Sequence, residues 1–212
     1  MWVNSAAIGV SVHSGWGAVV AVAGGHGAEE ILDRRRLTLI NPKTAGAAQP
    51  YHYIREMELR AAERHLAGCA NNSAHLALAG LTRVCETLLE RGFMVSGSVI
   101  VLSAARPLPA LEKILGSHPL IHTAEGEFFR QAFRSAFERL HVPVTGIRAC
   151  DLDVSAKKAF GKAAAKILTR VDGMGRSLGS PWTKDEKMAA LAAAIVLTGT
   201  HPKVHASRSS GP

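Results

Sequence analysis

Cysteine, aromatic residues and long apolar runs are all scarce in this sequence of 212 residues. The three cysteines are odd in number and widely spaced, and no C-x-x-C pair occurs, so neither a disulfide framework nor a cysteine zinc site is indicated. The longest apolar run, 188–197, is too short for a bilayer, which takes about 20 residues. No signal-peptide pattern opens the chain. We therefore expect a cytoplasmic protein without a membrane partner.

Motifs of common enzymes are missing as well. The sequence has no P-loop, no G-x-G-x-x-G pattern and no G-x-S-x-G nucleophile elbow. No complete catalytic constellation is therefore visible, and the sequence leaves open whether the chain is an enzyme.

What is present is the composition of a globular domain, with 47% hydrophobic and 20% charged residues. We expect a single domain over 1–199 and a flexible tail over 200–212, which is rich in Pro, Ser and Gly. The formal net charge of +8 attracts polyanions such as nucleic acid, anionic membrane surfaces or phosphorylated small molecules. This attraction alone does not define a function.

Short apolar runs typical of β-strands are followed along the chain by longer segments whose apolar residues have helical spacing. We expect strands at 6–12, 18–23, 30–40, 95–102 and 142–149. We expect one or two helices over 57–91, further helices at 111–115, 125–140, 154–171 and 183–197, and loops at 42–53 and 173–181. Glycine-rich turns between the first runs predict an antiparallel meander. The sequence thus predicts an α/β fold with a mixed five-stranded sheet and flanking helices.

The beginning of the chain resembles a known family. Residues 8–15, Ile-Gly-Val-Ser-Val-His-Ser-Gly, and the strand after them look like the opening hairpin of RuvC-type resolvases and related ribonuclease H-like proteins. The acidic, alanine-rich helix from Lys184 is similar to their closing helix. The resemblance covers most of residues 6–198. It implies a ribonuclease H-like fold.

The resemblance also implies a set of catalytic carboxylates, which this sequence holds only in part. Nucleases of this superfamily place an aspartate at the centre of the first strand to bind two divalent metal ions, and Ser11 stands at the matching position. A hydroxyl without a neighbouring carboxylate is a poor magnesium ligand. Asp185 and Glu186 on the closing helix remain candidate metal ligands, so a divalent metal cofactor stays an open expectation.

Polar residues near the first hairpin turn are candidates for ligand binding. His13 and Ser14 precede Gly15-Trp16-Gly17, where glycines would let backbone amides cradle a phosphate. Ser11 lies beside them, and Arg106 follows a buried strand, where open α/β sheets commonly place ligands. The alternative is a plain hairpin turn with a packed tryptophan.

Histidines and carboxylates also gather just before and within the expected helix 125–140. His122 with Glu125 or Glu127 would suit a general acid/base pair or part of a metal site. Alternatively, Thr123 caps the helix and the two glutamates complement the helix dipole. The sequence leaves both interpretations open.

A basic stripe is expected on the helix over 154–171. Every fourth residue is basic, and such a row suits the phosphate backbone of a nucleic acid; the members are Lys158, Lys162, Lys166 and Arg170. The alternative is a solvated helix face, because no aromatic residue is interleaved for base stacking.

Taken together, these patterns predict a ribonuclease H-like domain with an incomplete carboxylate set that binds a nucleotide or nucleic acid. The pocket is expected near Ser11, His13, Ser14, His122 and Glu125. Two alternatives stay open: a metal-dependent or acid/base hydrolase that uses His122 and its neighbouring glutamates, and a protein-interaction scaffold. The oligomeric state is not encoded in any visible pattern.

Overall fold

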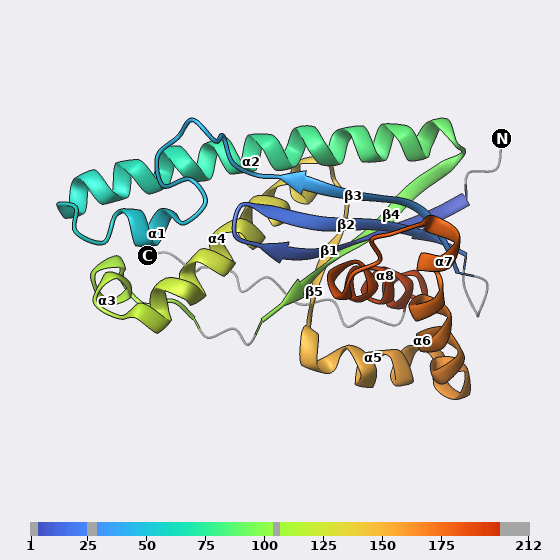
Figure 1. Cartoon of the computed structure of the whole chain (residues 1–212). Coiled ribbons are helices and arrows are strands. Elements are labelled where there is room, and N and C mark those ends of the chain that lie inside the picture. The colour runs from blue at the N-terminus through green and yellow to red at the C-terminus, as the bar shows by residue number, and fades with distance from the viewer. Residues whose placement is uncertain (1–3, 25–28, 104–106, 200–212) are drawn as a thin grey trace, which may run out of the picture.

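A mixed five-stranded sheet forms the centre of the molecule in a computed structural model that describes residues 4–24, 29–103 and 107–199 (Figure 1). Its strands are β1 (Asn4–His13), β2 (Trp16–Ala23), β3 (Glu30–Thr38), β4 (Phe93–Leu102) and β5 (Val144–Arg148). Their order across the sheet is β3-β2-β1-β4-β5. The first three strands are antiparallel neighbours, whereas β4 pairs with β1 and β5 with β4 in parallel. The expected opening meander and mixed sheet are confirmed.

Helices cover both faces of this sheet. They are α1 (Pro50–Tyr53), α2 (Leu59–Glu90), α3 (Leu111–Leu115), α4 (His118–Arg139), α5 (Leu152–Phe160), α6 (Ala164–Gly173), α7 (Gly175–Leu178) and α8 (Lys184–Leu197). The core on one face is built by α2 and α4, and the core on the other by α5, α6 and α8 (Figure 1). None of these described helices is long and apolar enough to cross a membrane.

Alternation along β1 decides which side chains meet α8. Ile8 and Val10 belong to the core under α2 and α4, so Gly9, Ser11 and His13 face the opposite side. Gly9 allows the closest approach, since a Cβ built on it would lie only 1.9 Å from the carbonyl oxygen of Ala189. The helix α8 therefore lies almost directly on the backbone of β1, with its first turn near Ser11 and His13.

The phenylalanine helix α4 begins earlier than its apolar stripe suggested, at His118 instead of residue 125. Pro119 occupies its first turn, where a missing backbone N–H costs nothing. The hydroxyl of Thr123 donates to the carbonyl of Pro119 inside the helix. The interpretation of Thr123 as a helix cap is therefore wrong.

The expected helix over 154–171 is interrupted. Gly161, with a φ of +56°, ends α5, and a 3-10 turn over Gly161–Ala163 leads into α6. Short helices α1 and α7 also lie within segments that were expected to be loops. By contrast, α2 is one continuous helix, which settles whether the segment over 57–91 holds one or two.

Candidate functional site

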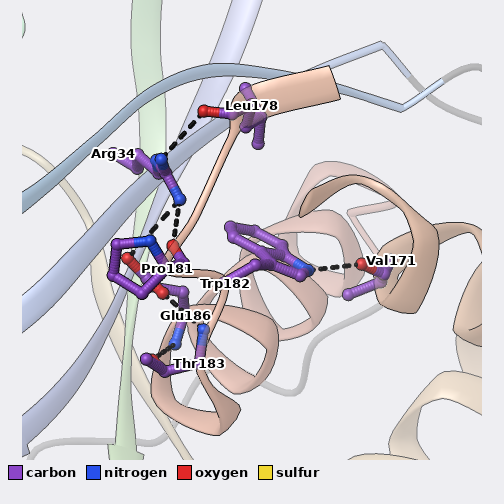
Figure 2. A network of polar contacts seen from close by, with 7 residues as sticks. All are labelled: Arg34, Val171, Leu178, Pro181, Trp182, Thr183 and Glu186. Carbon is purple, nitrogen blue, oxygen red and sulfur yellow. Dashed lines mark hydrogen bonds and ion pairs between the residues drawn. The ribbon is translucent and has the colours of Figure 1, made fainter. Parts of the chain in front are cut away.

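The N-terminus of α8 is held by an arginine from the opposite edge of the sheet. Arg34 on β3 donates to the carbonyls of Leu178, at 2.9 Å, and of Pro181, and its guanidinium lies 3.9 Å from Glu186 (Figure 2). The indole of Trp182 donates to the carbonyl of Val171 at 2.8 Å. These contacts fix the segment that leads into α8.

A capping box then starts the helix. The side chain of Thr183 accepts from the backbone N–H of Glu186, and the carboxylate of Glu186 accepts from the backbone N–H of Thr183 at 2.6 Å (Figure 2). Thr183 and the acidic first turn were expected to begin this helix, and they do. The carboxylate of Glu186, a predicted metal ligand, is thus engaged by the helix itself and by Arg34.

With α8 fixed in this way, Asp185 meets the end of β1. The hydroxyl of Ser11 donates to Asp185 Oδ1 at 2.9 Å, and His13 Nε2 lies 2.8 Å from the same oxygen. Ser11 is buried, whereas the side chain of His13 is 43% exposed. The sequence singled out all three residues, and folding brings them together.

These contacts set the charge of the carboxylate. Burial by itself raises the pKa of Asp185, but the hydrogen bonds from His13 and Ser11, together with the nearby charge of Lys184, outweigh burial and leave the pKa below its ordinary value. Asp185 therefore stays ionised at neutral pH and accepts from both partners.

A stack of side chains extends this site toward solvent. The His13 ring lies on Trp16 with centroids 4.4 Å apart and an interplanar angle of 9°, and the Arg36 guanidinium carbon is 3.9 Å from the Trp16 centroid. Ser14 lies exposed in the tight turn between β1 and β2, next to Gly15 with a φ of +81°. The tryptophan thus packs against the turn, and it also carries an exposed arginine.

A two-metal centre does not fit these residues. Divalent hard cations prefer several carboxylate oxygens around them. Among the described residues, Asp185 is the carboxylate that contacts Ser11 and His13, and its Oδ1 already accepts from both. The carboxylate of Glu186 accepts from the backbone N–H of Thr183 and lies close to Arg34. The chemistry of this donor set favours hydrogen bonding over coordination of paired magnesium ions.

A second cluster forms where α1 lies beside the first turns of α4. His52 of α1 meets His118 and His122 of α4, and one potential ligand atom from each histidine lies within 4.8 Å of the other two. The ring centroids are 5.4 Å apart for His52 and His118, 4.8 Å for His52 and His122, and 4.5 Å for His118 and His122.

The two predicted glutamates, Glu125 and Glu127, have different partners near this cluster. Glu125 is buried and accepts from His52 twice, from ring Nδ1 at 2.9 Å and from the backbone N–H at 3.2 Å. The nearby phenol of Tyr51 has its pKa raised by burial and by the charge of Glu125. Glu127 instead pairs with Arg130 at 2.9 Å. The partner of Glu125 is therefore His52, not the expected His122.

The expected single pocket is replaced by two clusters on different sides of the sheet. Ser11 and His13 face α8, whereas α4, which carries His122 and Glu125, packs on the opposite face. The clusters are separate because α4 packs with α2 on that face, where its first turns place His122 beside His52 of α1.

The basic stripe is divided as well. Its members are exposed, but Lys158 lies on α5, Lys162 on the 3-10 turn, and Lys166 and Arg170 on α6. Because the helix is interrupted at Gly161, a spacing of four no longer aligns them in one row. Arg170 also donates to the carbonyl of Glu29 at 3.1 Å. Arg106 and the tail over 200–212 lie outside the described residues.

Sequence reasoning missed three contributors. His52 sits in a segment without periodicity, and Arg34 and Arg36 belong to a basic triplet whose partners are distant in sequence. The spacing of His118 and His122 was a usable signal, since residues four apart share one face of a helix.

Known proteins resemble this chain in structure only. Scans against protein families and against curated sequences find no match. Among solved structures, RuvC of T. thermophilus in complex with a Holliday junction substrate matches with a TM-score of 0.53 and 13% identity, over 92% of this chain and 94% of that one. Another Thermus thermophilus RuvC structure gives a TM-score of 0.50 and 14% identity, over 91% and 93%. The chain therefore has the ribonuclease H-like fold in the form seen in RuvC, as its sequence predicted.

Proposed function

We propose that this chain is a nucleic-acid-binding domain whose binding surface lies around Ser11, His13 and Asp185, without two-metal nuclease chemistry. The observation that carries the proposal is the Ser11–Asp185–His13 arrangement at the end of β1 in a RuvC-like fold. The neighbouring RuvC structure holds a Holliday junction substrate, so branched DNA is the first ligand to test.

The charge of this surface supports binding of phosphates without metal. A nuclease with several ionised carboxylates repels phosphate until cations neutralise them. Here a serine replaces one aspartate, and the remaining Asp185 accepts from His13 and Ser11. Exposed Arg36 and Lys184 flank the site and add two positive charges. Such groups contact the nucleic-acid backbone directly.

The test compares binding of a fluorescent four-way DNA junction, a duplex and a single strand by anisotropy at two salt concentrations. We expect the double variant Arg36→Ala/Lys184→Ala to weaken junction binding at least tenfold. The slope of the logarithm of the binding constant against the logarithm of the salt concentration should become shallower by about two, as for the loss of two phosphate contacts. The matched control is Arg83→Ala/Arg139→Ala, which removes two exposed positive charges from α2 and α4 on the other face. We expect this control to weaken junction binding less than threefold.

Equal losses in both double variants would mean that binding is generic charge attraction, and the proposed surface would be wrong. Junction cleavage that depends on Mg²⁺ or Mn²⁺ and disappears in Asp185→Asn would contradict the absence of nuclease chemistry. Incubation of the wild-type chain with labelled junction and either metal measures this directly.

A further inference from the structure

We propose that His52, His118 and His122 form a binding site for one divalent transition-metal ion of the Zn²⁺ type. This site is separate from the surface proposed for nucleic acid, because α4 and α8 lie on opposite faces of the sheet. It rests on two geometric observations: the convergence of the rings, two of which are exposed, and the orientation of His52 by a buried carboxylate.

The first observation is convergence. One ligand nitrogen from each ring lies within 4.8 Å of the other two. In a tetrahedral zinc site with metal–nitrogen distances of about 2.0–2.1 Å, the nitrogens are about 3.4 Å apart. His118 and His122 are exposed, so their rings have room to rotate toward His52 when an ion binds. Because these two residues are four apart on α4, their rings project from the same face of the helix.

The second observation is the Glu125–His52 pair. The buried carboxylate of Glu125 accepts from Nδ1 of His52 at 2.9 Å, which places the ring proton on Nδ1 and leaves the lone pair of Nε2 available to a metal ion. Metal-binding histidines usually make this contact with a carboxylate through their second nitrogen. Glu125 is thus a positioning residue for His52.

The donor set selects the class of metal. Three imidazoles suit Zn²⁺ and related ions such as Co²⁺, whereas Mg²⁺ and Ca²⁺ prefer oxygen ligands. Glu127 pairs with Arg130 and lies outside the ligand set. Three protein ligands leave the fourth tetrahedral position for water or another small donor.

The site would also have a mechanical effect. A helix as short as α1 has little stability of its own, and it follows a long connection from β3. An ion held by one ligand from α1 and two from α4 would fasten this connection to the body of the protein. Metal binding should therefore raise the melting temperature.

The experiment titrates Zn²⁺ into the chelator-treated full chain by calorimetry at pH 7.5 and follows Co²⁺ binding by its visible absorption, which is intense only in tetrahedral sites. We expect one saturable ion per chain. His118→Ala and His122→Ala should each weaken binding at least a hundredfold and remove the absorption. Because the chain has ten histidines, His75→Ala, which removes an exposed histidine of α2, serves as the matched control and should change neither measurement.

Glu125→Gln tests the positioning role. We expect binding weakened ten- to a hundredfold and an altered cobalt spectrum, with Glu127→Gln as the control that leaves both unchanged. Circular dichroism monitors folding; if Glu125→Gln does not fold, the two exposed histidine variants decide the result. No saturable binding by the wild-type chain, or the same affinity in His118→Ala/His122→Ala, would overturn the proposal. Junction binding is measured separately, so failure of either proposal leaves the other intact.

Discussion

Ser11 and Asp185, 174 positions apart in the sequence, are joined by a hydrogen bond of 2.9 Å at the end of the first strand. His13 donates to the same carboxylate oxygen from two residues further along β1. The closing helix, which already packs on the sheet through its apolar face, is thus also joined to the opening hairpin by one ionised side chain. Four predictions follow from these contacts between α8 and the sheet.

The pH dependence of stability should reflect Asp185. Its pKa in the folded state lies below its ordinary value of about 3.9, so it contributes stability that is fully present above that pH and is lost as the pH falls through the folded pKa. Asp185→Asn should therefore lose less stability than wild type between about pH 5 and pH 2. Urea midpoints across this range measure the difference. Asp153→Asn, which removes an exposed carboxylate from α5, should lose stability as wild type does.

The close approach of α8 to β1 should require glycine at position 9. A Cβ in Gly9→Ala would meet the backbone of Ala189, which cannot rotate away, and we expect a loss of about 1–3 kcal/mol or more in the free energy of unfolding. Gly68→Ala is the control, because a Cβ there meets nothing within 4 Å on an exposed part of α2. It should stabilise by about 0.5–1 kcal/mol. Destabilisation by both variants to the same degree would contradict the proximity argument.

Arg34 should hold the segment before α8 in place. Arg34→Lys keeps the charge but cannot donate to Leu178 and Pro181 at once, so we expect a loss of roughly 1–2 kcal/mol and faster amide hydrogen exchange over residues 178–187. Exchange in α2 should stay unchanged. Thr183→Ala, which removes the cap without touching Arg34, should cost about 1 kcal/mol and affect mainly the first turn of α8. Unchanged exchange over 178–187 in Arg34→Lys would assign the anchoring to the cap alone.

The sheet was predictable because its signals are local. The apolar runs of β1, β2 and β4 each identify a strand from neighbouring residues, and the glycine at the turn between β1 and β2 identifies the hairpin. The acidic first turn and the cap at Thr183 likewise identified the start of α8. The meander and the helical crossovers then follow from connection rules.

The sites were predictable only in part because their partners are distant in sequence. Ser11, His13 and Asp185 could each be named, but their pairing depends on how α8 packs on β1. His52 has no sequence signal, because it lies in a segment without a period. The start of α4 was misplaced since the apolar stripe begins only after the first turns, although Pro119 marked the true beginning.

A second carboxylate at position 11 should convert the hydrogen-bonded site into one that needs metal. Ser11→Asp would place two negative charges within contact of each other, and their repulsion should destabilise the metal-free protein at pH 7 by about 1–4 kcal/mol. Addition of Mg²⁺ or Mn²⁺ should restore the melting temperature of this variant and leave wild type unaffected. Ser11→Asn, of similar size but uncharged, should show neither the loss nor the rescue. If metal stabilises wild type as much as Ser11→Asp, the carboxylates already present bind metal, and the serine has not removed that capacity.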